Sequence, residues 1–424
     1  MTKPENGLEM YHNILLDMLK TALALPVKSG STDAFSVKKT IEDAVKKCGY
    51  DSLGENVDWK RLIRCADSHG VLSLIADELE FIPGVEDSLR KYSMDKAKRI
   101  VLQNSRLLEL SAYYLKLLND NKITAVLLKG AQAASHYPIG ELRKSGDIDI
   151  LIADGQQFQR AVDILLSHGL SRVEEQHAGY HEELRGKSGI ILEIHHSLSE
   201  QFDNDDVNQK LAEYTRDMSR HISVKIINGR KIYALSEAYE ALTLVIHMLH
   251  HYLRAGFGLK LLCDWTVFWN RDIPDIEKEI FAGMLDELMI TGFVYSVNTI
   301  CIDRLGLSAS NVDFMMKKGV PADTEALLKD IIEAEEFGDA DSSRMVAMRG
   351  TSVKDYLREF HHQMKLNNPS ASRRKLLWPY LWLKTLIIFI RNNKKVRNTT
   401  VGGILKSAGK RSRLTKDMKL FTKP

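Results

Sequence analysis

The sequence predicts an α+β protein in which a small core of strands and helices is flanked by N- and C-terminal helical regions. Three observations support this prediction. Apolar residues follow a helical period in residues 8–120, short apolar runs alternate with helical patterns between 121 and 200, and helical patterns return after residue 235. We therefore divide the chain into an N-terminal helical region 1–120, an α/β core 121–235, a helical domain 236–370, and an apolar, aromatic segment with a basic tail 371–424.

The composition describes an ordinary globular chain. With 424 residues, 44% hydrophobic and 27% charged, it is long enough for two or three cores and is not a disordered protein. The four cysteines are scattered without a Cys-x-x-Cys pair, so we expect reduced thiols and no zinc site. No secretory signal is visible, and no run reaches the ~18 uncharged apolar residues of a spanning helix, so we expect a cytoplasmic protein.

The N-terminal region predicts helices only. Leu15, Leu19 and Leu23 share one helical face, and similar apolar patterns follow from Trp59 and from Ile100. No group of reactive side chains stands out here. We expect a helical cap or a layer that binds a partner.

The middle of the chain alternates between strand and helix patterns. Glycine and proline residues separate these patterns, as they do at turns. Further on, Ser236 can cap the first helix of the C-terminal helical domain. The expected elements of the core are a strand Ile123–Leu128, a helix Ala131–His136, a strand Gly146–Ile152, a helix Gln156–His168 and a strand Gly189–His195.

Two aspartates, Asp147 and Asp149, interrupt the apolar run of the second strand. Their spacing places both side chains on one face of the strand. Aspartate is a poor strand former and an unpaired buried charge is costly, so the pair needs a compensating cation. Glu193 interrupts the third strand and adds a third carboxylate if the two strands are neighbours. The alternative is that these acids are exposed at an edge of the sheet.

The acids and their neighbours predict a site for phosphate chemistry. Carboxylate oxygens suit Mg²⁺ or Mn²⁺, which assist nucleotidyl transfer. Gly130, placed before a helix, can present backbone N–H groups to a triphosphate. Lys129 and Arg143 add cations for the phosphates or the carboxylates. Lys129 can equally extend to solvent from the end of its strand.

Histidines add further candidates. His195 shares a strand face with Glu193, and His247 and His251 have the i, i+4 spacing of a zinc pair. The glutamate that metalloproteases carry between two such histidines is absent, because Met248 occupies its position. We expect these three histidines to have structural or substrate-lining roles.

Taken in order, these residues resemble a known family. Lys129-Gly130, Arg143-x-x-Gly146-Asp147-x-Asp149 and Leu192-Glu193-Ile194-His195 resemble the bacterial nucleotidyltransferase family proteins of the polymerase-beta-like superfamily. The similarity extends over residues 55 to 270. It implies a small mixed-sheet core and the transfer of a nucleoside monophosphate from a nucleoside triphosphate to an acceptor that the sequence does not identify. The roles it implies are a metal site of Asp147, Asp149 and Glu193 and nucleotide contacts from Lys129, Gly130, Arg143 and Gly146.

The sequence departs from this family pattern at two positions. The usual Gly-Ser turn is Gly130-Ala131, which removes a hydroxyl that often contacts the γ-phosphate. Lys260 stands where an arginine is expected, and it cannot form the two-pronged contact that arginine makes. The alternative to an enzyme is therefore a catalytically inactive binding or scaffold protein with the same fold.

The end of the sequence is strongly basic. Residues 391–424 contain eleven Lys or Arg and one acid, Asp417, and an apolar and aromatic stretch, 376–390, precedes them. One interpretation is a docked helix followed by a solvated tail. Another is weak contact with the anionic inner surface of the membrane. Binding of nucleic acid is the weakest interpretation.

Overall fold

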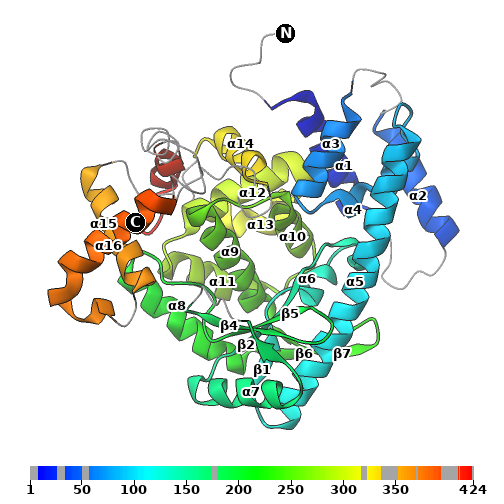
Figure 1. Ribbon diagram of the computed structural model, residues 1–424. Coiled ribbons are helices and arrows are strands. Elements are labelled where there is room, and N and C mark those ends of the chain that lie inside the picture. Colours follow the sequence, from blue (N-terminus) through cyan, green and yellow to red (C-terminus); the bar gives the residue numbers. More distant parts are fainter. Residues whose placement is uncertain are drawn as a thin grey trace.

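A mixed sheet with helices on both faces lies at one end of the molecule, next to a larger group of helices (Figure 1). The computed structural model describes residues 8–25, 34–49, 57–173, 179–316, 322–335, 352–368, 371–392, 409 and 411–422. The prediction of an α+β protein with a mixed-sheet core and flanking helices is confirmed.

The sheet has seven strands in the order β3-β4-β5-β2-β1-β7-β6. The pairs β2–β5 and β1–β7 are parallel and the other neighbours are antiparallel. The strands are β1 Ala125–Leu127, β2 Asp147–Ile152, β3 Ser171–Arg172, β4 His181–Arg185, β5 Ile191–His195, β6 Ile222–Ile227 and β7 Arg230–Leu235.

The two faces of the sheet contact different helices. Ile148, Ile150 and Ile152 of β2 pack in one apolar cluster with residues of α5 (Asp87–Asp120) and α7 (Gly155–Ser167). Leu151 of the same strand belongs to a second cluster, which contains residues of α9 (Glu237–Arg254) and α10 (Leu259–Trp269). Asp147 and Asp149 therefore point to the side of α9 and α10, because alternate residues of a strand face opposite ways.

The N-terminal helices and the later helices share one apolar core. Buried residues of α1 pack in the same cluster as those of α10 and α12. The boundaries expected at 120 and 235 stay predictions. The other helices are α1 Met10–Leu23, α2 Ala34–Lys47, α3 Trp59–Ser68, α4 Leu72–Ile75, α6 Ala131–Ala134, α8 Asp205–Asp217, α11 Asp275–Glu287, α12 Thr291–Leu305, α13 Ala309–Met316, α14 Thr324–Ala334, α15 Val353–Asn367 and α16 Trp378–Asn392.

Four strands, β3, β4, β6 and β7, were not expected from the sequence. β6 and β7 form a hairpin whose turn residues, Asn228 and Gly229, both have positive φ, 44° and 76°. This conformation fits the tight hairpin turn that Asn-Gly favours. Ser236 does precede α9, but its side chain donates a hydrogen bond to Glu277 at 3.1 Å and does not cap the helix.

The last described residues return to the helical core. Arg411 is buried, and its guanidinium contacts Asp330 at 3.2 Å and the backbone carbonyl of Tyr252. Leu414, Met418 and Phe421 pack in the core cluster, and Gly292 lies so close to the backbone of Met418 that a Cβ would be 2.1 Å from its carbonyl oxygen. The expectation of a solvated tail is therefore wrong for residues 411–421, while residues 393–408 lie outside the described ranges.

None of the helices within the described ranges is both long enough and apolar enough to cross a membrane.

Candidate metal and nucleotide site

Three carboxylates meet on the face of the sheet that contacts α9 and α10. β2 and β5 run parallel with Asp149 opposite Glu193, and Asp147 lies two residues before Asp149 on the same face. One carboxylate oxygen from each of the three residues lies within 4.8 Å of the other two. The acids expected from the sequence to act together are thus neighbours, and we call them the acidic cluster.

Two cations contact the buried carboxylate of Asp149. The Nζ of Lys129 and the Nε2 of His195 each lie 3.1 Å from its Oδ1. The same Nε2 lies 3.1 Å from Oε2 of Glu193. The second oxygen of Asp149, Oδ2, is buried and has no hydrogen-bond partner among the described residues. Three hard oxygen donors and one unsatisfied buried oxygen fit a Mg²⁺ or Mn²⁺ ion.

The charged side chains of the site shift one another's pKa values. The neighbouring carboxylate of Asp149, together with burial, raises the pKa of Asp147, and Lys129 and Lys260 oppose this effect. Burial disfavours charge on His195, but hydrogen bonds to Asp149 and Glu193 raise its pKa to about 9. Burial opposes ionisation of Glu193 as well, yet the hydrogen bond from His195 and the charge of Lys129 lower its pKa. Lys129 and His195 thus hold the carboxylates of Asp149 and Glu193 close together.

Gly130 connects β1 to α6 beside the acidic cluster. Its φ of 70° lies in the region that residues with a Cβ rarely adopt, so the turn requires glycine. A Cβ there would also approach the backbone oxygen of Asp147 at 3.9 Å. The turn therefore holds the chain after Lys129 next to the first acid of the cluster.

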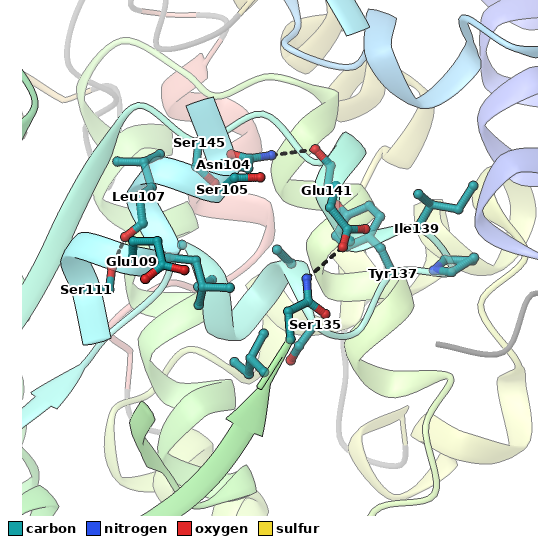
Figure 2. A pocket seen from close by; sticks show the side chains of 18 of the residues that line it. Asn104, Ser105, Leu107, Glu109, Ser111, Ser135, Tyr137, Ile139, Glu141 and Ser145 are labelled. Carbon is teal, nitrogen blue, oxygen red and sulfur yellow. Dashed lines mark hydrogen bonds between the residues drawn. The ribbon is translucent and has the colours of Figure 1, made fainter. Parts of the chain in front are cut away.

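A cleft of about 1120 Å³ opens at this turn. Its lining includes Lys129, Gly130, Ala131 and Asp147 on one side. Figure 2 shows further lining residues, among them Asn104, Leu107 and Ser111 of α5 and Ser135, Tyr137 and Glu141 from the chain before β2. The cleft is large enough for a nucleotide. Of the acidic cluster, Asp147 lines it, while Asp149 and Glu193 are not among its lining residues.

Helix α5 fixes the loop that leads into β2. Asn104 donates hydrogen bonds to the carbonyl oxygen of Glu141 at 2.6 Å (Figure 2) and to that of Arg143 at 2.7 Å. The neighbouring Gln103 donates to the carbonyl of Ser145 at 2.8 Å. The side chains of Gln103 and Asn104 thus hold the loop that comes directly before Asp147 and β2.

Arg143 contributes to the same support. Its Nε and Nη2 donate to both oxygens of Asp264, each at 2.6 Å, and the Tyr137 hydroxyl donates to the first of them at 2.6 Å. Both charged side chains are buried. Of the two roles expected for Arg143, contact with phosphate or orientation of the aspartate strand, this geometry favours the second. Asp264 thus pairs with Arg143, while Arg254 pairs with Glu200.

A comparison with models of known protein families identifies the family of this chain. A family model described as an uncharacterised nucleotidyltransferase matches residues 55–306, which is more than half of the chain. The chain belongs to this nucleotidyltransferase family. The narrower expectation, a bacterial group of the polymerase-beta-like superfamily, stays a prediction.

Among solved structures, the chain is similar to an antigenic nucleotidyltransferase-like protein from Paracoccidioides brasiliensis. The identity is 14%, the match covers 49% of this chain and 96% of that chain, and the TM-score is 0.30. We draw no argument from a likeness this low. No curated protein matches the chain.

In this nucleotidyltransferase family member, the histidines of α9 lie near the acidic cluster but not in the cleft lining. Burial, and then the charge of Lys129, lowers the pKa of His247. His251 packs against it with ring centroids 4.5 Å apart, and burial lowers its pKa as well. Both rings are therefore neutral near pH 7. Their substrate-lining role and that of His195 stay predictions, as do the nucleotide contacts of Lys129, Gly130 and Gly146.

Sequence reasoning missed His181. It lies on β4 opposite His195, and the two histidines with Glu193 form a second group of side chains close enough to hold an ion. Its strand, His181-Glu-Glu-Leu-Arg185, has one buried apolar residue and gives little strand signal. The period-two alignment of His181 with Glu183 was the only hint that the sequence offered.

Proposed function

We propose that the protein is a metal-dependent nucleotidyltransferase that moves a nucleoside monophosphate from a nucleoside triphosphate to an acceptor hydroxyl and releases pyrophosphate. The observation that carries this proposal is the acidic cluster at the edge of a cleft that begins at Gly130. Family membership supports the class of reaction.

In this proposal Asp147, Asp149 and Glu193 hold one or two Mg²⁺ or Mn²⁺ ions. Bound there, such ions neutralise the negative charge of the phosphates that react. The buried Oδ2 of Asp149, which has no hydrogen-bond partner among the described residues, suits a cation at this position. Lys129 contacts the other oxygen of the same carboxylate and lines the cleft, which supports a role for it between the acids and the triphosphate.

The transfer is a displacement at the α-phosphorus. The acceptor oxygen forms a bond to this phosphorus, the bond to the bridging oxygen breaks, and pyrophosphate leaves with that electron pair. The proton of the acceptor hydroxyl passes to a carboxylate of the acidic cluster. Lys129 and the backbone at Gly130 hold the triphosphate, while Arg143 keeps the loop before β2 in place. The acceptor itself is unidentified.

Calorimetric titration with nucleoside triphosphates tests the proposal. Asp147→Asn with Asp149→Asn removes two ligand charges at nearly constant shape, so Mg²⁺-dependent binding of the triphosphate should be lost. The matched control is Asp87→Asn with Asp275→Asn, whose side chains are 99% and 93% exposed. Binding that survives in the first variant contradicts the metal site.

A second candidate function, an inactive binding or scaffold protein, is favoured by one observation. Ala131 follows the glycine turn and lines the cleft without the hydroxyl that the family pattern carries there. Flat titrations with ATP, GTP, CTP and UTP in the presence of Mg²⁺ would favour the scaffold. Ala131→Ser restores the hydroxyl, and an affinity gain in that variant would show that the turn still binds phosphate.

A further inference from the structure

Helix α16 packs on α15 with one side only. Leu381 and Thr385 are buried, and the ring of Trp378 lies 4.6 Å from that of His361 on α15. Trp382 contacts the same helix through Phe360, with ring centroids 6.2 Å apart. These contacts bury one face of α16 against α15.

The opposite face is also apolar. Leu376, just before the helix, and then Tyr380, Leu383 and Ile387 follow at intervals of four, three and four residues, which places them on one line along the helix. They are 95%, 65%, 57% and 56% exposed. We call these four residues the outer stripe. A helix that is apolar on both sides is normally buried on both sides, yet within the described part of the chain the outer stripe is exposed.

The charged residues of α16 and of the short segment before it have one sign. Residues 371–392 contain five Lys or Arg and no Asp or Glu. Arg373, Arg374 and Lys375 come directly before the outer stripe and are exposed, and Lys384 lies within the helix. A surface that is apolar along its centre and cationic around it is complementary to a bilayer with anionic headgroups.

We propose that α16 binds the surface of an anionic lipid bilayer, with the outer stripe inserted among the acyl chains and the basic residues on the headgroups. Its 15 residues span about 22 Å at 1.5 Å per residue, which is shorter than the ~30 Å hydrocarbon core. The helix therefore lies along the surface. Trp382 is amphipathic, a property that suits the level of the headgroups.

The position of α16 leaves the proposed site accessible. Figure 1 shows α15 and α16 at an edge of the molecule, away from the sheet and from the part of α5 that lines the cleft. Bound in this way, the protein would keep its cleft open to solvent. The proposal stands on these surface features and does not depend on the nucleotidyltransferase reaction.

Co-sedimentation of the full chain with vesicles tests the proposal. Vesicles of phosphatidylcholine with phosphatidylglycerol should bind the protein, and phosphatidylcholine alone should bind it much more weakly. Each cation near an anionic surface strengthens binding roughly fivefold, so Arg373→Gln, Arg374→Gln and Lys375→Gln together should weaken it about a hundredfold. Equal binding to both kinds of vesicle overturns the proposal.

A charge-matched pair of variants separates the outer stripe from net charge. Leu383→Glu with Ile387→Glu should weaken vesicle binding by at least about tenfold, because two carboxylates would enter the acyl region. Leu102→Glu with Ile276→Glu adds the same charge at positions that are 62% and 61% exposed on α5 and α11, and it should bind like the unmodified protein apart from a modest electrostatic effect. Far-ultraviolet circular dichroism checks that all variants are folded.

Three further results would overturn the proposal. One is equal vesicle binding by the two glutamate pairs. Another is a dimer in sedimentation velocity that Leu383→Glu with Ile387→Glu abolishes while vesicles are not bound, which would make a second copy the occupant. A third is binding of duplex DNA but not of vesicles, which would assign the cations to nucleic acid.

Discussion

Two buried aspartates on neighbouring elements behave in opposite ways. Asp264 and Asp149 are 2% and 1% exposed. Asp264 receives a two-pronged contact from Arg143 and a hydrogen bond from Tyr137, so both of its oxygens are satisfied. Asp149 receives both of its cations on one oxygen and leaves the other without a partner among the described residues. This difference indicates that the carboxylate of Asp264 supports the fold, whereas the carboxylate of Asp149 has an oxygen available for a metal ion.

The largest effect on stability is expected at Asp264. Asp264→Asn leaves the buried guanidinium of Arg143 without a counter-charge, and breaking such a pair costs about 3–5 kcal/mol. Denaturant unfolding of the variant should show this loss. A loss below 1 kcal/mol would mean that the pair is dispensable and that the comparison with Asp149 does not hold.

A third buried acid, Glu240, tests whether a satisfied carboxylate stabilises the fold in a pH-dependent way. It contacts His136 at 2.6 Å and Lys225 at 3.3 Å. Burial opposes its charge, but its contact with His136 and the charge of Lys225 lower its pKa from 4.5 to about 2. A lowered pKa stabilises the fold at pH values above 4.5, and this contribution, roughly 3 kcal/mol at full size, is lost as the pH falls from 4.5 towards 2.

Unfolding of the wild type and of Glu240→Gln between pH 7 and pH 2 measures this contribution. The variant should be less stable at pH 7 and should lose less stability on acidification. Parallel curves for the two proteins would assign the acid sensitivity to other groups.

The smallest effect on stability is expected at Asp149. Asp149→Asn removes the main partner of Lys129 and His195, but it also removes a charge that repels Asp147, and His195 keeps its contact with Glu193, so the free energy of unfolding at pH 7 should fall by less than it does for Asp264→Asn. Metal-dependent nucleotide binding should nevertheless be lost. A stability loss as large as that of Asp264→Asn would identify Asp149 as a structural residue.

The acidic cluster was predictable because short sequence patterns, each within one strand, place its residues. Asp147 and Asp149 share a face by the period of a strand, and Glu193 joins them once its strand is placed beside β2. The pairing of Arg143 with Asp264 was not predictable, because 121 residues separate them and only the packing of α10 beside the sheet brings them together. His181 was not predicted because its strand lacks the alternation of apolar and polar residues that marks a strand. The hairpin of β6 and β7 was not predicted either, although Asn228-Gly229 is a typical turn sequence.

The position of residues 411–421 in the helical core affects when that core can fold during synthesis. They complete the helical core around Arg411 and pack Met418 against Gly292, yet they are synthesised after every strand and every helix from α1 to α16. The sheet and its α5–α7 face can form while translation continues, but the core shared by α1 and α12 stays incomplete until these residues leave the ribosome. Deleting everything after residue 370 would remove both α16 and this closing segment. Substitutions within α16 are therefore the better way to study its surface.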